Sequence, residues 1–522
     1  MSTIYKNPII PGFAPDPSIV FVKDTFFLVN SSFHIFPGLP IYASRDLASW
    51  THIGNAINKT SQLDLSNATT DAFPIGLNKN LVAALGLFAP TIRWHNEVFY
   101  IICTNASRKE AGGLRTDNFI ITSTDIWADE WSDPIWFEYD GIDPSLLFDD
   151  KTGKVYVQAS WREGSMADRN CSIRQFEIDV TTGKRLSDIQ VIWKGSDGSV
   201  DGKSDIEGPH MYHKDGFYYL LAADGGTFED HKVVISRSRD IWGPFEVYEK
   251  NPVLTAAGTE EYVQNVGHAD LFQDAFGAWW AVALGVRNES GGRKPIGRET
   301  FLVPVDWPAG EWPVFGRAKM QFERFALPEK EPIPKPTERV DDVYIRDASL
   351  DHYKFSADGS SITLIPSRQG LSATHGTTTF LGKRQRSSCC TATAILHVPT
   401  DPDLRAGLVL YKEDVRHVEI YYDSNTGKVR LEACFKMKGE PKVMAEHATT
   451  SQKVQMQISA TTLSYEFFIR MEAETEWILL ASIDALEMTA CDFNGTLFGI
   501  FANTTREAES ASIVKLEEFS VS

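Results

Sequence analysis

Three carboxylates stand at matching positions of a repeated sequence pattern. Five segments can be read in parallel: Asp16-PSIVFVKDTFFLVNSS, Ala89-PTIRWHNEVFYIICTN, Asp143-PSLLFDDKTGKVYVQAS, Glu207-GPHMYHKDGFYYLLAAD and His268-ADLFQDAFGAWWAVALG. If these five head residues meet in space, Asp16, Asp143 and Glu207 become neighbours. Hydrolysis of a glycosidic bond needs one carboxylic acid to protonate the leaving oxygen and one carboxylate on the opposite face of the sugar. A third carboxylate nearby raises the pKa of the acid, because like charges disfavour ionisation.

A purely structural reading of these acids also exists. An Asp before Pro, as at Asp16 and Asp143, often caps a turn without any chemistry. Three acids at equivalent positions of a repeat fit this reading less well than one would, because bringing them together is costly unless the site uses their charges. The pattern therefore favours a catalytic site.

The elements around the head residues predict a five-bladed β-propeller. Each of the five segments has an alternating strand, a polar turn such as KDG or DDKTGK, and a second strand rich in β-branched or aromatic residues, which is the pattern of a hairpin. A period of about 50 to 70 residues with one small antiparallel sheet per unit is typical of propellers. Since the innermost strand of each blade lines the central channel, the five heads are expected to converge there. A long β-sandwich is the alternative.

A second all-β domain is expected after the propeller. We assign residues 1–325 to the propeller, 326–343 to a linker that contains the Pro-rich and charged stretch PEKEPIPKPTERVDD, and 344–522 to a β-sandwich. The last range holds short alternating segments such as HVEIYYD and KVQMQIS, with turns about every 8 to 12 residues. The chain is therefore predicted to be all-β, with a lectin-like sandwich behind a propeller.

Composition restricts the partners. A formal charge of −19 argues against nucleic acid and anionic membrane surfaces, and it is compatible with a neutral polysaccharide. No segment reaches the roughly 18 to 20 apolar residues of a membrane span. The six cysteines are too sparse for a disulfide scaffold and are expected to be free thiols. The start MSTIYKNPIIPGF lacks the features of a secretory signal, so a cytoplasmic location is expected; N-x-S/T triplets such as that at Asn105 keep secretion as the alternative.

Several motifs resemble those of glycoside hydrolase family 43, and in particular its β-xylosidase and α-L-arabinofuranosidase branch. They are PGFAPDPS, SSFHIFPGLPIYASRDL, FAPTIRW, GIDPSLLFDD, IEGPHMY, VGHADLF and GRET, in this order along the chain. The resemblance covers nearly the whole chain and implies a propeller followed by a sandwich. It implies an inverting enzyme in which Asp16 is the general base, Glu207 is the general acid, and Asp143 tunes the pKa of Glu207 and holds it in place.

The same resemblance implies further site residues. Arg298 of GRET is expected to hydrogen-bond the terminal sugar, although an arginine there could equally be a structural ion-pair partner. Phe33 is expected to form an aromatic wall, and Phe88 stands in FAP where relatives usually carry WAP; both could also be core residues. His268 is expected near a structural calcium ion or a water cluster, although a lone His is more often structural and calcium prefers oxygen ligands. No cofactor is required for the chemistry.

The expected function is release of terminal pentose, xylose and/or arabinose, from xylan or xylooligosaccharides. We favour an exo-acting β-1,4-xylosidase, with dual activity as a variant of it. The first alternative is an α-L-arabinofuranosidase that debranches arabinoxylan, and the distant one is a non-catalytic polysaccharide-binding lectin. The sandwich is expected to close one side of the channel mouth, with residues 367–388 as candidates for the contact. The sequence leaves the oligomeric state open.

Overall fold

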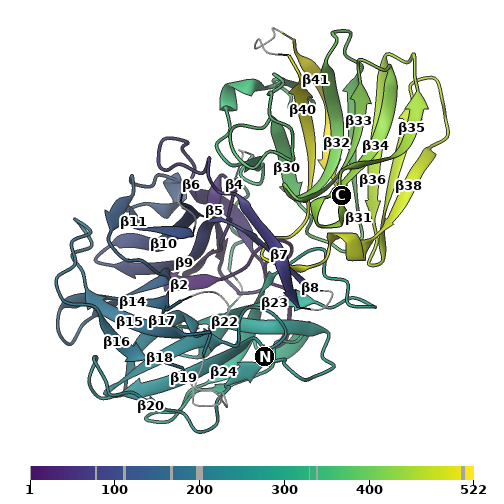
Figure 1. Cartoon of the computed structure of the whole chain (residues 1–522). Helices are drawn as coiled ribbons and strands as arrows, with labels where there is room; N and C mark the ends of the chain where they lie inside the picture. The colour runs from purple at the N-terminus through teal and green to yellow at the C-terminus, as the bar shows by residue number, and fades with distance from the viewer. Residues whose placement is uncertain are drawn as a thin grey trace.

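The computed structural model describes residues 2–76, 79–109, 113–164, 169–195, 204–328, 330–336, 339–506 and 512–522. Figure 1 shows two lobes built almost entirely of strands: a propeller drawn in purple to teal and a sandwich drawn in green to yellow. The helices of the described residues are short 3-10 segments such as η1 (Ile126–Ala128), and none of them is long and apolar enough to cross a membrane. The predicted all-β class is confirmed.

Five antiparallel sheets form the propeller, which confirms the five-bladed prediction. The first three blades are β2 (Ser18–Val22), β3 (Thr25–Val29), β5 (Gly38–Ser44) and β6 (Thr51–Ile57); β9 (Gly86–His95), β10 (Val98–Arg108), β11 (Leu114–Ser123) and β12 (Ile135–Phe137); and β13 (Ile142–Asp149), β14 (Lys154–Arg162), β15 (Cys171–Glu177) and β16 (Gln190–Trp193). The last two are β17 (Glu207–Lys214), β18 (Phe217–Asp224), β19 (Lys232–Ser238), β20 (Glu246–Val247) and β21 (Leu254–Thr255); and β22 (Val263–Gln273), β23 (Trp279–Arg287), β24 (Glu299–Asp306) and β25 (Val314–Phe315).

Middle strands of the blades are buried on both faces. In β3 all five residues, TFFLV, are buried, and in β18 all residues but the first are buried. A strand covered on both faces reads as a nearly continuous apolar run, because neighbouring sheets pack against each side of it. Blade-on-blade packing therefore explains why these segments do not alternate strictly.

The N-terminal segment is clamped to the last blade. Strand β1 (Ser2–Lys6) pairs with β26 (Gln321–Phe325), the last strand before the connection to the sandwich. The side chain of Asn7 then donates to the carbonyl oxygen of Leu302 at 2.9 Å and accepts from the backbone N–H of the same residue at 2.8 Å. These bonds tie the two ends of the propeller to each other.

Two packed sheets form the C-terminal domain. One contains β28 (Tyr353–Phe355), β29 (Ser361–Leu364), β41 (Val514–Val521), β31 (Cys390–His397), β36 (Lys453–Ala460), β37 (Ser464–Met471) and β38 (Ile478–Asp484). The other contains β30 (Phe380–Arg384), β40 (Leu497–Thr504), β32 (Leu404–Glu413), β33 (Arg416–Asp423), β34 (Lys428–Phe435) and β35 (Lys442–Ala448). Burial alternates residue by residue along β36 and β37, as expected for strands with one face on the core. The predicted sandwich is confirmed.

Backbone pairing joins the two domains. Strand β39 (Cys491–Asp492) of the C-terminal region runs parallel to β8 (Lys79–Ala84), which pairs in turn with β7 (Thr70–Gly76) of the propeller region. In a second contact, β27 (Tyr344–Ile345) pairs with β4 (Ile35–Phe36). One buried apolar cluster extends from the first blade into the sandwich. The two domains therefore form a continuous structure at this junction.

The predicted linker, residues 326–343, has no regular strand in its described part. Residues 329, 337 and 338 of this range lie outside the described residues. The six cysteines are all free, as expected.

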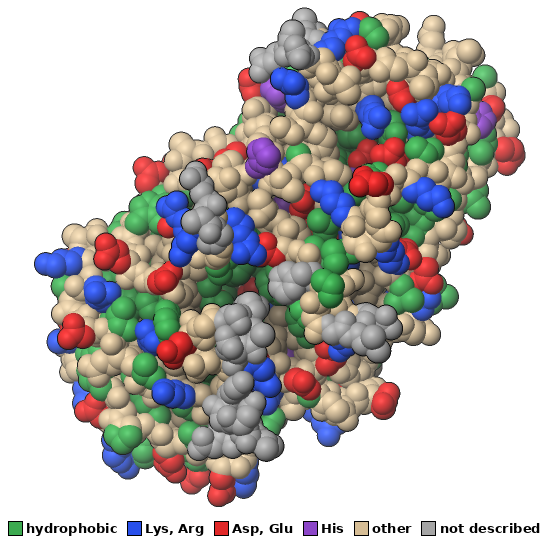
Figure 2. Space-filling model, viewed as in Figure 1, with side chains coloured by type: hydrophobic (Ala, Val, Ile, Leu, Met, Phe, Trp, Pro, Cys, Tyr) green, Lys and Arg blue, Asp and Glu red, His purple; other side chains and the backbone are tan. Residues whose placement is uncertain are grey.

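On the surface, basic side chains on the face seen in Figure 2 are interspersed with acidic ones.

Candidate active site

A repeated backbone distortion places the head residues of the blades. The angle φ is 51° at Asp16, 37° at Ala89, 55° at Asp143 and 48° at His268, and in the fourth blade it is 55° at Gly208, directly after Glu207. Non-glycine residues rarely adopt this left-handed region, and such strained positions concentrate at functional sites. The strand pairing shifts register at the same points of the third, fourth and fifth blades. In these three blades the first strand therefore has an irregularity of the pairing at the head residue.

One cavity brings the predicted site residues together. Among the described residues its lining consists of Asp16, Phe33, Phe88, Ala89, Ile142, Asp143, Glu207, Thr227, His268, Arg298 and Phe493. All seven residues singled out from the sequence for catalysis, substrate binding or metal binding are in this set. Ala89 was expected at the channel as the head of the second blade, and the residues missed were Ile142, Thr227 and Phe493.

Asp16 is held in its ionised form. Its Oδ2 accepts a hydrogen bond from Ser31 Oγ at 2.7 Å, and its Oδ1 lies 3.0 Å from Nη1 of Arg298 and 3.8 Å from Nδ1 of His268. Burial alone would raise the pKa of Asp16, but Arg298, His268 and the Ser31 hydroxyl together hold this pKa below its usual value. At neutral pH Asp16 is therefore an unprotonated carboxylate.

Glu207 has the opposite protonation state. Burial, followed by the charge of Asp143, raises the pKa of Glu207 to about 8, while Arg162 opposes the shift. Burial and the neighbouring Asp16 also raise the pKa of Asp143, whose Oδ2 accepts from the backbone N–H of Gly208 at 3.0 Å. The site therefore holds a protonated carboxyl group and an ionised one at the same pH.

Arg298 makes hydrogen bonds to several parts of the cavity wall. Its Nη1 donates to Thr227 Oγ1 at 3.1 Å as well as to Asp16, and its Nε and Nη2 donate to the carbonyl oxygen of Phe493 at 3.4 Å and 3.2 Å. The guanidinium carbon also lies 5.5 Å from the ring centroid of Phe33 and 5.1 Å from that of Phe493. Arg298 thus joins Asp16, the fourth blade and the C-terminal domain.

Three phenylalanine rings form one wall. The ring centroids of Phe33 and Phe88 are 5.2 Å apart, those of Phe33 and Phe493 are 5.7 Å apart, and those of Phe88 and Phe493 are 6.1 Å apart. Phe33 and Phe88 belong to the propeller, whereas Phe493 comes from the C-terminal domain. The sandwich therefore contributes a side chain to the cavity.

Residues 367–388, the candidates for this contact, do not line the cavity themselves, although Leu371 and Phe380 of this segment belong to the same buried apolar cluster as Phe33. Within the described residues the C-terminal domain lines the cavity through Phe493, and the end of the predicted segment touches the propeller elsewhere, where Arg386 Nη1 donates to the carbonyl oxygen of Pro11 at 2.9 Å. Phe493 lies in the irregular stretch between β39 and β40, which has no periodic pattern. The sequence carries no local signal for its role.

A buried cluster of charges fixes the chain just before Phe493. Asp492 Oδ2 lies 2.8 Å from Nζ of Lys412 and 2.7 Å from Nη2 of Arg416, and Arg416 also pairs with Glu413. Each of these four side chains is at most 6% exposed to solvent. A buried charge is costly unless it is paired, so this arrangement strongly specifies where Asp492 lies. The position of Phe493 follows from it.

The surroundings of His268 do not fit the predicted calcium ion. Calcium takes six to eight oxygen ligands, and no group of three or more His, Cys, Asp or Glu side chains in the described part of the chain could hold a metal. Further inside the propeller, Asp270 is already bound by Nη1 and Nη2 of Arg93 at 2.8 Å and 3.2 Å, and it accepts from the Tyr212 hydroxyl at 2.6 Å. Arg93 thus supplies the positive charge there.

The fold and the cavity define a glycoside hydrolase class of site, with a protonated and an ionised carboxyl group in a propeller channel. Residues 5–313 match the family described as Glycosyl hydrolases family 43, and residues 343–522 match the Beta xylosidase C-terminal Concanavalin A-like domain. The chain belongs to glycosyl hydrolase family 43, and it is a glycoside hydrolase.

Known proteins resemble the chain over its whole length. It is 32% identical to the non-reducing end alpha-L-arabinofuranosidase BoGH43B of Bacteroides ovatus, covering 97% of this chain and 92% of that protein. It is 34% identical to a xylosidase/arabinosidase of Butyrivibrio fibrisolvens, covering 96% of each. The crystal structure of xylan beta-1,4-xylosidase from Bacillus halodurans superposes with a TM-score of 0.86 at 26% identity, over 99% of both chains.

Proposed function

We propose that this protein is an exo-acting, inverting hydrolase that releases terminal pentose, xylose and/or arabinose, from xylan or xylooligosaccharides. β-1,4-Xylosidase activity is the favoured form. Relatives named as xylosidase, arabinosidase or both support the substrate class. The observation that carries the proposal is the separation of the two carboxyl pKa values, with that of Asp16 lowered and that of Glu207 raised to about 8.

In the proposed mechanism Glu207 is the general acid. It protonates the glycosidic oxygen as the bond to the anomeric carbon breaks, and Asp16 removes a proton from a water molecule that attacks the opposite face of that carbon. Asp143 keeps Glu207 protonated through its negative charge and the burial that they share. The chemistry uses carboxyl groups and water alone. Attack by water in one step inverts the anomeric configuration.

Exo action is proposed because Phe493 closes one side of the cavity. A bare propeller would leave its channel mouth open to a long chain lying across the acids. Because the rings of Phe33, Phe88 and Phe493 form a wall on that side, we expect the cavity to take the end of a chain and not its middle. Arg298 lines the cavity and is placed to donate hydrogen bonds to the hydroxyls of that terminal sugar.

An α-L-arabinofuranosidase that debranches arabinoxylan is the second candidate, and the Bacteroides ovatus relative carries that name. Hydrolysis rates on p-nitrophenyl β-D-xylopyranoside and p-nitrophenyl α-L-arabinofuranoside discriminate the two. We expect the xyloside to be cleaved with the higher kcat/KM; a rate on the arabinoside that exceeds it tenfold or more, as an order of magnitude, would establish the alternative.

Proton NMR of xylobiose hydrolysis tests the stereochemistry. Inversion predicts that the newly released sugar first accumulates as the α anomer, before mutarotation. Initial accumulation of the β anomer would contradict the assignment of Asp16 as a base that acts through water.

A further inference from the structure

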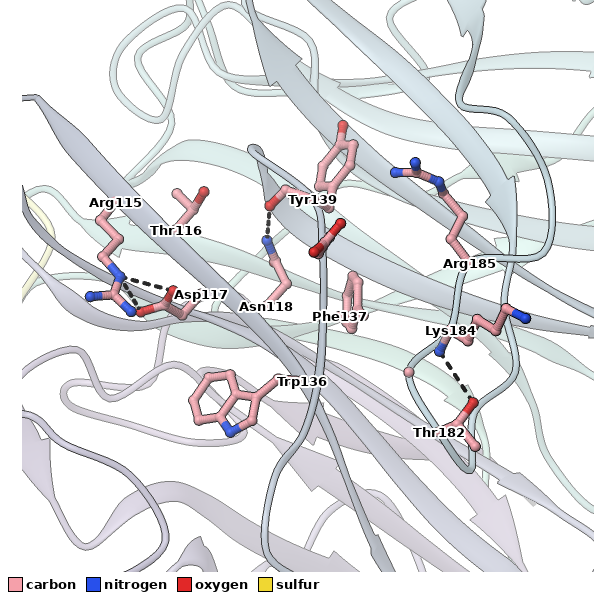
Figure 3. Close-up of a pocket in the computed structure, with 12 residues that line it drawn as sticks. Arg115, Thr116, Asp117, Asn118, Trp136, Phe137, Tyr139, Thr182, Lys184 and Arg185 are labelled. Atoms are coloured by element: carbon pink, nitrogen blue, oxygen red, sulfur yellow. Dashed lines mark hydrogen bonds and ion pairs between the residues drawn. The ribbon is translucent and has the colours of Figure 1, made fainter.

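A second groove lies on the outer wall of the propeller between the second and third blades. It has a volume of about 850 Å³ and is formed by β11, β12 and the turn that follows β15. That volume lies within the range of small-molecule binding sites. The groove shares no lining residue with the catalytic cavity. Figure 3 shows Trp136 at one end and the guanidinium of Arg185 pointing across toward Tyr139.

The walls of the groove are rigidly held. Gly183 has a φ of 73°, and a side chain there would place its Cβ 2.1 Å from the carbonyl oxygen of Trp136, so only glycine lets the turn approach β12. Within the turn the backbone N–H of Gly183 donates to the carbonyl oxygen of Asp179 at 2.8 Å, and the Asp179 carboxylate accepts from the N–H of Thr181 at 2.9 Å. The groove therefore exists without a ligand to shape it.

Trp136 offers an apolar platform. Its side chain is on an edge strand, is 45% exposed, and packs on Phe119 with ring centroids 5.4 Å apart. One part of the indole thus rests on the blade while the rest faces the groove. Flat aromatic surfaces of this kind stack on the C–H faces of sugar rings.

Charged side chains of both signs surround this platform. In the described part of the chain no hydrogen bond or ion pair engages the side chains of Glu138, Lys184 or Arg185. Arg115 uses its Nε for Asp117, at 3.0 Å from Oδ1. Carboxylates only accept hydrogen bonds, and ammonium and guanidinium groups only donate them. A surface that offers both matches hydroxyl groups, which do both, better than it matches a polyanion.

The groove is also connected to the catalytic cavity. The buried side chain of Asn118 donates to the carbonyl oxygens of Tyr139 and Gly141 at 2.8 Å and 3.1 Å. Gly141 leads directly into β13, where Ile142 and Asp143 line the catalytic cavity. The two Asn118 bonds thus fix the backbone at Tyr139, which lines the groove, and at Gly141, which directly precedes the segment that carries Asp143.

We propose that this groove is a second, non-catalytic binding site for a neutral xylan-type oligosaccharide chain, with Trp136 as its stacking platform and Arg185 and Glu138 as hydrogen-bonding groups. The ligand class rests on the proposed function. The site would hold polymer near the catalytic pocket, which by itself accepts a chain end.

Calorimetric titration of the full-length Glu207→Gln variant with xylohexaose tests the site, because this variant is expected to hydrolyse the ligand only slowly. We expect two xylohexaose molecules to bind per chain of this variant. When Trp136→Ala or Arg185→Ala is combined with Glu207→Gln, we expect one. The matched control is Trp127→Ala, which removes a tryptophan of similar exposure, 48%, outside the groove and should leave two bound. A single bound molecule before any groove mutation, or two after both, overturns the proposal.

Kinetics separate this proposal from the proposed function. In the otherwise native enzyme, Trp136→Ala should raise KM on soluble xylan about tenfold, the loss expected for one aromatic contact, and leave kcat/KM on p-nitrophenyl β-D-xylopyranoside unchanged. Equal KM values on xylan for Trp136→Ala and Trp127→Ala would contradict the second site. Failure of the native enzyme on both nitrophenyl pentosides would instead contradict the proposed function.

Discussion

The mouth and the interior of the propeller channel treat buried charge in opposite ways. At the mouth, Asp16, Asp143 and Glu207 share one cavity, and Arg298 is bonded to Asp16 alone among them. Further inside, the carboxylate of Asp270 is matched by both Nη atoms of Arg93 and by further hydroxyl donors. The interior is an internally neutral pair, whereas the mouth retains excess negative charge. Burial, together with that excess of negative charge, raises the pKa of Glu207. The paired charges of the interior therefore stabilise the fold, and the unbalanced charges at the mouth set the protonation state of Glu207.

Removing a carboxyl group from the mouth should therefore cost activity and spare stability. We expect Glu207→Gln and Asp16→Asn each to lower kcat on xylobiose by about 10² to 10⁴-fold, the usual contribution of a general acid or base. Circular dichroism should stay native in both variants. The melting temperature of Glu207→Gln should also stay close to the native value, because Gln replaces a carboxyl group that is already uncharged at neutral pH. Either variant keeping more than about a tenth of native kcat on this unactivated substrate would refute the assigned role.

Removing a charge from the interior of the channel should instead lower the stability of the fold. Arg93→Met leaves Asp270 buried without its cation, and breaking such a pair costs about 3 to 5 kcal/mol of unfolding free energy. Denaturant unfolding measures this loss. The matched control is Arg317→Met, whose partner Glu261 is on the surface; with side chains 69% and 38% exposed, that pair should contribute less than about 1 kcal/mol. Similar losses in the two variants would show that the interior pair is not a stabilising element.

The charge cluster of the sandwich adds a third case, because it does not line the cavity and affects the mouth only by positioning Phe493. Asp492→Asn weakens the pairing to Lys412 and Arg416 and should displace Phe493. We expect kcat/KM on xylobiose to fall on the order of tenfold to a hundredfold, with the pH limbs unmoved, since misplacement of a wall leaves the acid and base in place. Glu487→Gln, an exposed pair partner of Lys438 in the same region, is the control. A loss shared by both variants would contradict the positioning role of Asp492.

The smallest effect is expected from metal removal. Because the oxygens of Asp270 are occupied by Arg93 and its other donors, dialysis against EDTA should leave kcat and the melting temperature unchanged. A loss of either that is restored by added calcium would show that a metal site exists near His268 after all.

Much of this arrangement could be predicted from the sequence because it repeats. The head residues occur once per blade at the start of a hairpin, so the periodic pattern predicted both the five blades and the meeting of Asp16, Asp143 and Glu207. Phe493 could not be found this way, because it lies in a non-repeating stretch and reaches the cavity only through the packing of one domain on the other. Thr227 likewise lies in a loop after β18.

The ion pair of Arg93 and Asp270 does have a signal in the sequence. Arg93 and Asp270 are charged residues within first strands that are otherwise largely apolar, APTIRW and HADLF. A buried charge in such a strand needs a partner of opposite sign. Matching the two across blades would have predicted the ion pair, and it would have argued against calcium at this position.

The pH dependence of kcat/KM tests the central claim most directly. Glu207 must be protonated to act, so activity should fall as pH rises through its pKa of about 8. Asp143→Asn removes the neighbouring negative charge that helps to raise this pKa, so Glu207 should ionise at lower pH and the alkaline limb should move downward. Xylobiose is the substrate to use, because its leaving group needs protonation. An alkaline limb near pH 8 that moves to lower pH in Asp143→Asn is the predicted result; a profile merely scaled down, with both limbs unmoved, would contradict the account.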